Sequence, residues 1–193
     1  MHITLSALLS LAHLSLTLAA TTSNAISSIA NATLTPPIRY YLKTSVIDDD
    51  DSDKNDLYVT SWHTGAGFGD ATLRPFSTLN KTVGFLNDTR QQFDLYTSIT
   101  YGMIMAPSDN LEHVAWNFVR INDLASNAGD GSMSGFFFNA SGLQWEGEGV
   151  WMSAGWLACD WWHGVPQLFW VFSRHLTSIP SSCAIVELLP FAV

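Results

Sequence analysis

Residues 166–172, PQLFWVF, are apolar on both faces of an extended chain, and this stretch decides the fold class. Successive side chains of a β-strand point to opposite faces, so Leu168 and Trp170 would lie on one face and Phe169 and Val171 on the other. Because a strand with two apolar faces must be covered on both of them, it belongs inside a protein. We expect this strand to lie centrally, in a covered barrel or between packed layers.

The rest of the chain repeats this pattern of short apolar segments, rich in aromatic and β-branched residues and separated by Gly, Asn, Asp and Pro. No window keeps helical spacing for three turns. Besides residues 166–172, the predicted strands are 39–47, 57–64, 81–87, 92–99, 101–106, 115–122, 135–145 with a turn near Gly142, 155–161 and 184–190. The sequence predicts an all-β, single-domain antiparallel sandwich or barrel. A β-trefoil is the alternative, because ATLRPF, AWNFVRI and QLFWVF are similar segments.

The ends of the chain predict export from the cell. Residues 1–20, MHITLSALLSLAHLSLTLAA, contain no Asp, Glu, Lys or Arg and are typical of a signal peptide, with an uncleaved membrane anchor as the alternative. Residues 21–37 have the composition of a disordered leader, so residues 38–193 are the predicted domain. N-glycosylation sequons, at Asn31, Asn80, Asn87 and Asn139, agree with a secreted, extracellular or cell-wall location.

Cys159 and Cys183 are the two cysteines of the chain. An even count in an oxidising compartment favours one disulfide, which would close a loop of about 25 residues and contribute about 3 kcal/mol. The alternative is a pair of buried free thiols. Since neither cysteine belongs to a CxxC pair, the sequence gives no support for a zinc ribbon or a thioredoxin-type site.

Charge and motifs exclude several function classes. The net charge is −9 and the basic residues are scattered, which disfavours nucleic acid binding. No second apolar stretch approaches the roughly 20 residues of a membrane span. The acidic run Asp48–Asp56, DDDDSDKND, fails the EF-hand pattern and is interpreted as a solvated loop. We predict no metal site and no cofactor.

The stretch Cys159–Trp170, CDWWHGVPQLFW, is the main candidate site. A turn over Asp160–Val165 would bring Trp161, Trp162 and His163 to one end of the sheet. These residues could fill the core, with His163 donating to a carbonyl, or could present indoles as a ligand platform. Catalysis by Asp160 with His163 is the third interpretation, but it needs a nucleophile or metal that the sequence does not identify.

A second candidate, SWHTGAGFGDATL, places His63 and Asp70 on either side of a glycine-rich stretch. It is not a dinucleotide-binding fingerprint, because Asp70 stands where the third glycine is needed and no strand–helix context follows. We interpret it as a wide hairpin loop, with ligand contact by His63 and Asp70 as the alternative.

Five segments, YYLKT, LYVTSWHTGAGFGDATL, GFFFNASGLQW, GWLACDWWHGVPQLFW and IPSSCAIVELLP, resemble in that order a family of small secreted fungal proteins that carry a domain of unknown function. The resemblance implies a fungal origin, secretion and one domain that ends in a paired Cys159 and Cys183. It implies no activity and no catalytic residue. GWLAC and CAIVELLP are also similar to segments of fungal hyphal and phialide cell-wall proteins.

These observations together favour a non-enzymatic, glycosylated, secreted binding module for a cell-wall polysaccharide or a surface protein. Its predicted ligand contacts are Trp161, Trp162 and His163, with His63 and Asp70 as neighbours. One alternative is a hydrolase of unfamiliar type that uses Asp160, His163, His63 and Asp70. The other is an effector or structural wall protein that acts by protein contact.

Overall fold

The computed structural model describes residues 34–47, 49–78, 82–107, 116–125, 131–147, 153–172 and 179–193. All of these residues belong to one compact unit, Thr33–Val193. The predicted signal peptide, the leader as far as residue 33, and the sequons at Asn31 and Asn80 lie outside the described residues.

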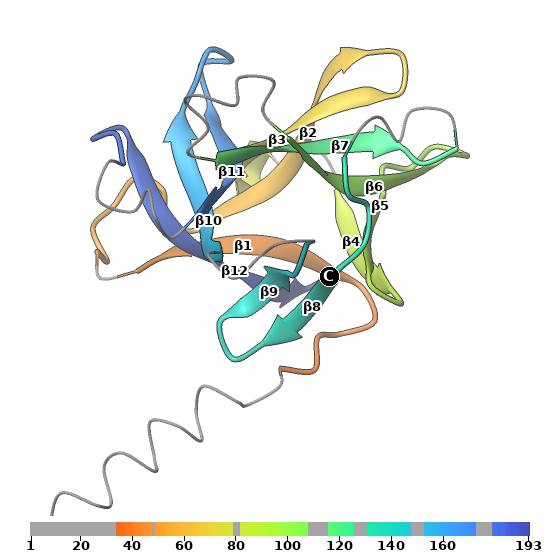
Figure 1. Cartoon of the computed structure of the whole chain (residues 1–193), viewed down its shortest axis with the longest axis horizontal. Coiled ribbons are helices and arrows are strands. Elements are labelled where there is room, and N and C mark those ends of the chain that lie inside the picture. The colour runs from red at the N-terminus through yellow and green to blue at the C-terminus, as the bar shows by residue number, and fades with distance from the viewer. Residues whose placement is uncertain are drawn as a thin grey trace, which may run out of the picture. The chain divides into compact units, whose positions relative to one another are not determined.

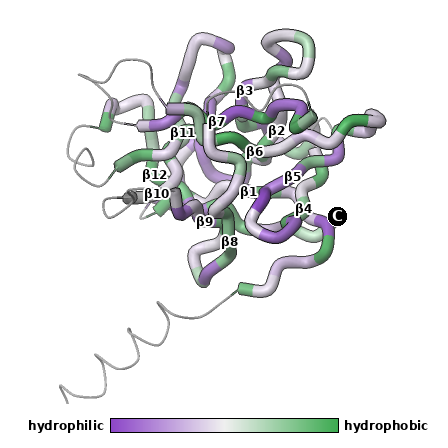
Figure 2. Tube along the Cα trace, turned by 45° about the vertical axis from the view of Figure 1, so that its right-hand side comes forward, coloured by the Kyte–Doolittle hydropathy of each residue, from purple (hydrophilic) through white to green (hydrophobic). Residues whose placement is uncertain are grey.

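Strands dominate the described part of the chain, and no α-helix occurs in it (Figure 1). The strands are β1 (Tyr40–Val46), β2 (Leu57–Gly65), β3 (Phe68–Pro75), β4 (Val83–Asn87), β5 (Arg90–Asp94), β6 (Thr100–Ala106), β7 (Trp116–Asp123), β8 (Phe136–Asn139), β9 (Gly142–Trp145), β10 (Ser153–Asp160), β11 (Pro166–Phe172) and β12 (Cys183–Ala192). One 3-10 turn, η1 (Phe76–Thr78), follows β3. In Figure 2, hydrophilic residues (purple) and hydrophobic residues (green) are interspersed along the strands, as expected for strands with one covered face.

The sheet closes into an antiparallel barrel, which confirms the predicted fold class. Strand neighbours run from β1 through β4, β5, β6, β7, β11, β10 and β12 and return to β1. The β2–β3 hairpin pairs with β1 at one side and with β7 and β11 at the other. A β-trefoil would require the pairing scheme to repeat three times along the chain, and the described pairings do not repeat in this way.

Strand β11 is covered on both faces, as its sequence predicts. Leu168 and Trp170 belong to the main core inside the barrel. Phe169 and Val171 belong to a second cluster on the outer face, together with Leu157, Cys159 and partly buried residues that include Trp116 and Phe118 of β7. The central position of β11 fixes where the turn that precedes it emerges from the barrel.

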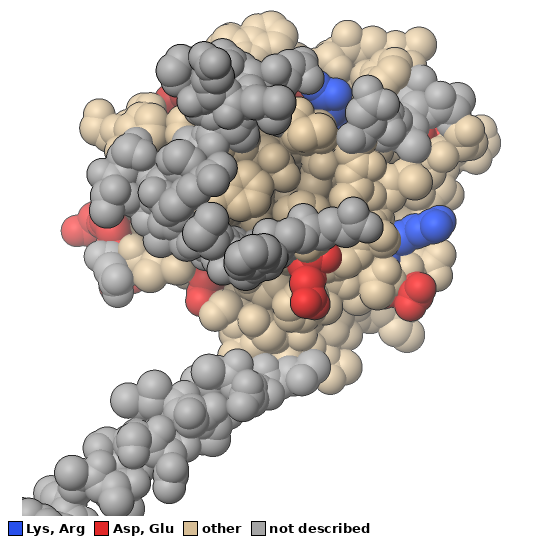
Figure 3. All heavy atoms as spheres, viewed as in Figure 1, with Lys and Arg blue, Asp and Glu red and all other residues tan. Residues whose placement is uncertain are grey.

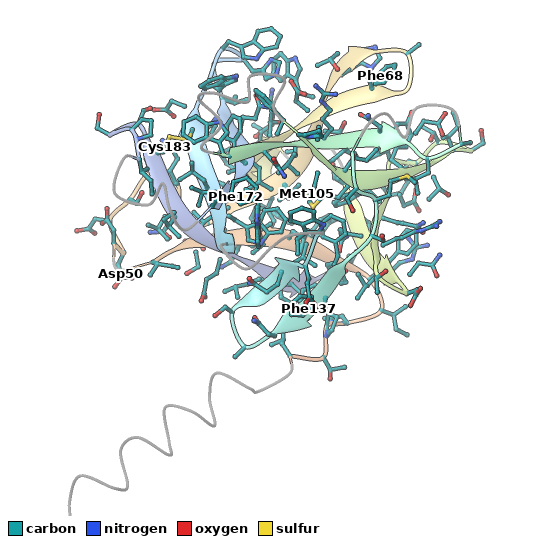
Figure 4. All side chains as sticks on the ribbon, in the orientation of Figure 1. Asp50, Phe68, Met105, Phe137, Phe172 and Cys183 are labelled. Carbon is teal, nitrogen blue, oxygen red and sulfur yellow. A yellow bond between two sulfur atoms is a disulfide. The ribbon has the colours of Figure 1, made fainter. Side chains whose placement is uncertain are left out.

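Aromatic side chains fill the barrel interior. The ring of Trp170 lies edge-on to those of Trp156 and Trp145, at centroid distances of 4.7 and 5.8 Å. The indole Nε1 of Trp156 donates a hydrogen bond to the carbonyl of Leu143. Met105, labelled in Figure 4, belongs to the same core, and Phe172 packs against it. The interior is therefore packed by aromatic side chains, and Nε1 of Trp156 has a backbone partner there, whereas Nε1 of Trp170 is buried without a hydrogen-bond partner among the described residues.

The Cys159–Cys183 disulfide is confirmed. The two cysteines are direct partners in the β10–β12 ladder, with Cα atoms 4.0 Å apart. Because the bond joins neighbouring strands just before the turn that carries Trp161 and Trp162, it holds the base of that turn.

Two local predictions require correction. The glycine-rich stretch is not a wide loop, since β2 and β3 are joined by a tight turn in which Gly67 has a φ of 78°. Glycine tolerates this left-handed backbone without the steric cost of a Cβ, so the strands continue almost to the turn. The predicted strand 92–99 is also too long, because β5 ends at Asp94 and Tyr96 has a φ of 58°.

The acidic run is more ordered than a solvated loop. Lys54 is only 4% exposed, and its Nζ lies 2.8 Å from a carboxylate oxygen of Asp53 and 2.8 Å from one of Asp160. Burial alone would lower the pKa of Lys54, but the hydrogen bonds and charges of Asp160 and Asp53 outweigh it, so this pKa is raised. A lysine within an acidic run can be buried because its charge is paired there. Asp48 lies outside the described residues.

Tyr40 of β1 places a phenol in the core. Its hydroxyl donates a hydrogen bond of 2.8 Å to Oε1 of Gln91, and no part of its surface is exposed. Burial raises the pKa of Tyr40 above its ordinary value, although the hydrogen bond to Gln91 acts in the opposite direction. The folded state therefore holds the phenolic proton more tightly than the unfolded chain does.

This proton should make the barrel sensitive to alkali. A group with a raised pKa contributes fully below its unfolded value, near 10 for tyrosine, and loses that contribution as the pH rises further. We expect Tyr40→Phe to lose about 1 kcal/mol at pH 7 with the hydrogen bond, and its unfolding free energy to fall less steeply than the parent's above pH 10. Urea unfolding between pH 7 and 11.5 measures both slopes, with Tyr41→Phe on the outer face of β1 as the control. Equal slopes for the parent and Tyr40→Phe would contradict this account.

Candidate functional site

The candidate site lies where the β10–β11 turn meets the β2–β3 hairpin. Nε2 of His163 in the turn is 2.8 Å from Oδ2 of Asp70 on β3. Asp70 is the direct cross-strand partner of Trp62 on β2. Pairing of β3 with β11 brings the two hairpins together, so residues far apart in the sequence share one site.

The imidazole of His163 is enclosed by aromatic rings. It stacks on the indole of Trp62 with a centroid distance of 4.8 Å, and it contacts the indole of Trp162 at 3.9 Å. Only 1% of the His163 side chain is exposed, against 16% for Asp70. The guanidinium of Arg74 lies 5.1 Å from the Trp62 ring, a distance typical of a cation–π contact. The bond to Asp70 and the ring contacts together fix the imidazole in place.

The two tryptophans of the turn differ in exposure. Trp162 is 73% exposed, although its ring contacts the fixed imidazole. Trp161 is 39% exposed and packs edge-on against Phe169 of β11, with ring centroids 5.3 Å apart. The turn therefore presents one indole to solvent on a rigid support, while the other indole mainly anchors the turn to the outer cluster.

The remaining predicted contacts are distributed differently. Asp160 pairs with Lys54 of the acidic run rather than with His163. His63 is exposed and follows Trp62 along β2, so the alternation of a strand directs it away from the face that holds Trp62. The partner of His163 is a carboxylate and not the predicted carbonyl. Of the candidates, the structure thus brings together Asp70, His163 and Trp162.

Trp62 and Arg74 are site residues that the sequence analysis missed. A signal for Trp62 was present, because a tight turn in the glycine-rich stretch would place it opposite Asp70. Arg74 follows Asp70 by four residues on β3, so the alternation of a strand places both side chains on the same face. Interpreting this stretch as a wide loop concealed both relations.

The site combines an imidazole, a carboxylate and two indoles. His163 and Asp70 form a dyad, and the imidazole also contacts the rings of Trp62 and Trp162. Within the described ranges, no three His, Cys, Asp or Glu residues gather into a set that could hold a metal ion. An exposed indole beside a partly exposed carboxylate can contact a ligand that has an apolar face and hydroxyl groups.

Comparison with known protein families assigns the chain. Residues 37–192 match the model of a domain of unknown function, DUF7907. The chain belongs to this family. The DUF7907 domain includes every residue of the site described above and both cysteines, and it excludes residues 1–36. No curated protein and no solved structure matches the chain.

Among the residues that the structure describes, no helix has the length and apolar character that crossing a bilayer requires.

Asp70→Asn should weaken the support beneath Trp162. The substitution keeps the shape of the side chain but removes the carboxylate charge that His163 contacts in an enclosed position. We expect a loss of about 1 to 2 kcal/mol in the free energy of unfolding, measured in urea. Asp94→Asn is the matched control, since Asp94 pairs with Arg39 at the surface and should contribute less than about 0.5 kcal/mol. Equal losses from the two substitutions would show that the His163 contact has no special role.

Proposed function

We propose that this DUF7907 protein is a secreted, glycosylated fungal protein that binds a cell-wall or host-surface polysaccharide without catalysing a reaction. The observation that carries the proposal is the Trp162 indole, which is 73% exposed and rests on an enclosed imidazole. An indole held in water on a fixed support is pre-organised for contact with a ligand, so little ordering has to occur on binding. Residues 1–20 and the sequons support the secreted part of the proposal.

A neutral polysaccharide fits the chemistry of this surface. The C–H face of a pyranose can stack on an indole, and Asp70, whose carboxylate is partly exposed, can accept hydrogen bonds from sugar hydroxyls. The net charge of −9 disfavours polyanions, because the protein would repel them. On the face shown in Figure 3, charged side chains stand apart from one another and form no continuous basic patch. We therefore favour neutral sugars over acidic ones.

Retention on insoluble polysaccharides tests the proposal. Parent protein is mixed with β-glucan, chitin or mannan, and the bound fraction is measured after sedimentation. We expect retention on at least one polymer and a loss of tenfold or more for Trp162→Ala, because truncation of a central aromatic contact commonly costs 2 kcal/mol or more, which at about 1.4 kcal/mol per tenfold exceeds that factor. Phe76→Ala is the matched control, since Phe76 is 57% exposed and lies outside the site.

The control variant and the parent also define the results that would refute polysaccharide binding. Retention of Phe76→Ala should equal that of the parent, and both variants should unfold at the parent's urea concentration. No retention of the parent on any of the polymers, or equal retention of Trp162→Ala and parent, would refute polysaccharide binding by this surface.

A second candidate function is hydrolysis, which the 2.8 Å contact between His163 and Asp70 favours. Such a pair can act as a base and its orienting carboxylate. The enclosure of His163 opposes this role, since a substrate would have to displace an indole to reach the ring. Release of soluble sugar from the same polymers by the parent, and its absence for His163→Gln, would establish this second function in place of the first.

A further inference from the structure

Two of the sequons lie on the turns of β-hairpins. Asn87 is the last residue of β4, it is exposed, and the turn that follows is Asp88–Thr89. Asn139 is the last residue of β8, and the turn Ala140–Ser141 follows it. Hairpin turns have open space around them, so a bulky substituent on either asparagine would not disturb the barrel wall.

The two turns belong to one end of the barrel. The backbone N–H of Phe136, at the start of β8, donates a hydrogen bond of 2.9 Å to the carbonyl of Thr89. From Phe136 the strand runs three residues to Asn139, which is about 10 Å at the usual rise of a strand. In Figures 1 and 2 the β4–β5 and β8–β9 hairpins lie toward the bottom, whereas the β2–β3 and β10–β11 turns lie at the top.

The local hydrogen bonds leave the reactive nitrogens available for modification. Oδ1 of Asn139 accepts a 2.9 Å bond from the backbone N–H of Ser141, and this bond does not involve Nδ2. Nδ2 of Asn87 donates to Oε1 of Gln92 over 3.4 Å, a long and weak bond. After one hydrogen of an amide nitrogen is replaced by a sugar carbon, the other hydrogen can still donate, so this bond can persist in the modified protein.

We propose that Asn87 and Asn139 both carry N-linked glycans and that these glycans cover the end of the barrel opposite to Trp162. In each transfer Nδ2 forms a bond to the anomeric carbon of an oligosaccharide. The bond from that carbon to a lipid diphosphate breaks, the diphosphate leaves, and Nδ2 loses one proton. The inference rests on the proposed secretion but not on polysaccharide binding by Trp162.

Two exposed aromatic residues report on the two ends of the barrel. Phe137 of β8 is 40% exposed and lies two residues before Asn139. Phe68, also 40% exposed, lies at the start of β3 beside the β2–β3 turn. Figure 4 shows Phe137 at the bottom and Phe68 at the top of the same view. Glycans on the two hairpins would shield Phe137 from solvent and leave Phe68 and Trp162 accessible.

Site mapping tests the modification directly. The full chain is secreted from a eukaryotic host, the glycans are released enzymatically in heavy-oxygen water, and the labelled aspartates are located by peptide mass spectrometry. We expect label at Asn87 and Asn139. Thr89→Ala and Ser141→Ala should each remove one label, because they destroy the sequon while keeping the asparagine and the backbone groups that hold the turn. A secreted parent that lacks the label at Asn87, at Asn139 or at both would overturn the proposal.

Hydroxyl-radical footprinting tests the placement of the glycans. Removing the glycans from the folded protein should increase the oxidation of Phe137 at least twofold and leave the oxidation of Phe68 and Trp162 unchanged. Increased oxidation of Trp162 would show that the glycans cover the candidate site and would overturn the proposed placement. Neither measurement uses a polysaccharide, so the glycan proposal and the binding proposal can fail separately.

Discussion

Trp156→Ala should lose about 3 to 5 kcal/mol in the free energy of unfolding. Trp156 is fully buried in the barrel, its ring is edge-on to Trp170, and its Nε1 donates to the carbonyl of Leu143. Truncation removes the indole, leaves a cavity between layers of aromatic rings, and leaves a buried carbonyl without that donor. Since most domains are stable by only 5 to 15 kcal/mol, a large part of the stability would disappear. Urea unfolding followed by circular dichroism measures the loss.

Trp162→Ala is the matched control for this substitution. It removes the same atoms from a side chain that is 73% exposed, so we expect a change within about 0.5 kcal/mol. A loss from Trp162→Ala as large as that from Trp156→Ala would contradict the assignment of one tryptophan to the core and the other to the surface.

Removal of the disulfide should have the second largest effect. Cys159→Ala together with Cys183→Ala opens a loop whose ends are 24 residues apart, and we expect a loss of about 2 to 5 kcal/mol. The bond joins β10 to β12 at the base of the Trp161–Trp162 turn, so proteolysis at that turn should also become faster. The double variant and the parent are compared in urea, with and without a thiol reductant.

The reductant supplies the control for the cysteine prediction. It should lower the stability of the parent to about that of the double variant and leave the double variant unchanged. Equal stability of the oxidised parent and the double variant would show that the covalent bond contributes little to the barrel.

The all-β fold could be predicted because the sequence of β11 shows that both faces of this strand are apolar. Leu168 and Trp170 alternate with Phe169 and Val171, and a strand of that kind has to be covered twice, as it is. The Cys159–Cys183 bond followed from an even cysteine count. Barrel closure could not be derived, because it depends on pairings such as β1 with β12 that join distant parts of the chain.

The candidate site could be predicted only in part, for the same reason. Trp162 and His163 are neighbours in the sequence and were recognised as a group. Asp70 lies 93 residues from His163, and their contact arises from the pairing of β3 with β11. No local pattern states which strands pair across a barrel. The interpretation that joined Asp160 to His163 rested on their nearness in sequence, but Asp160 pairs with Lys54.

The acidic run shows a similar limit of local reasoning. Its composition predicts a solvated loop, yet Lys54 is buried. Its ammonium group pairs with the carboxylates of Asp53 and of Asp160 at the end of β10. Asn55 then orders the run from within, since its Nδ2 donates to the carbonyls of Asp49 and Asp50. Composition describes the average environment of such a segment and not the one side chain that turns inward.

The central claim is that the exposed indole of Trp162 binds a sugar. Its most direct test follows the indole N–H resonances of the eight tryptophans by NMR. The protein is titrated with soluble oligosaccharides of β-linked glucose, N-acetylglucosamine or mannose. The account predicts that the Trp162 signal shifts and saturates with at least one of these sugars, while the signals of the buried Trp156 and Trp170 do not move. A Trp162 signal that stays unchanged with every sugar, or a shift confined to other tryptophans, would contradict it.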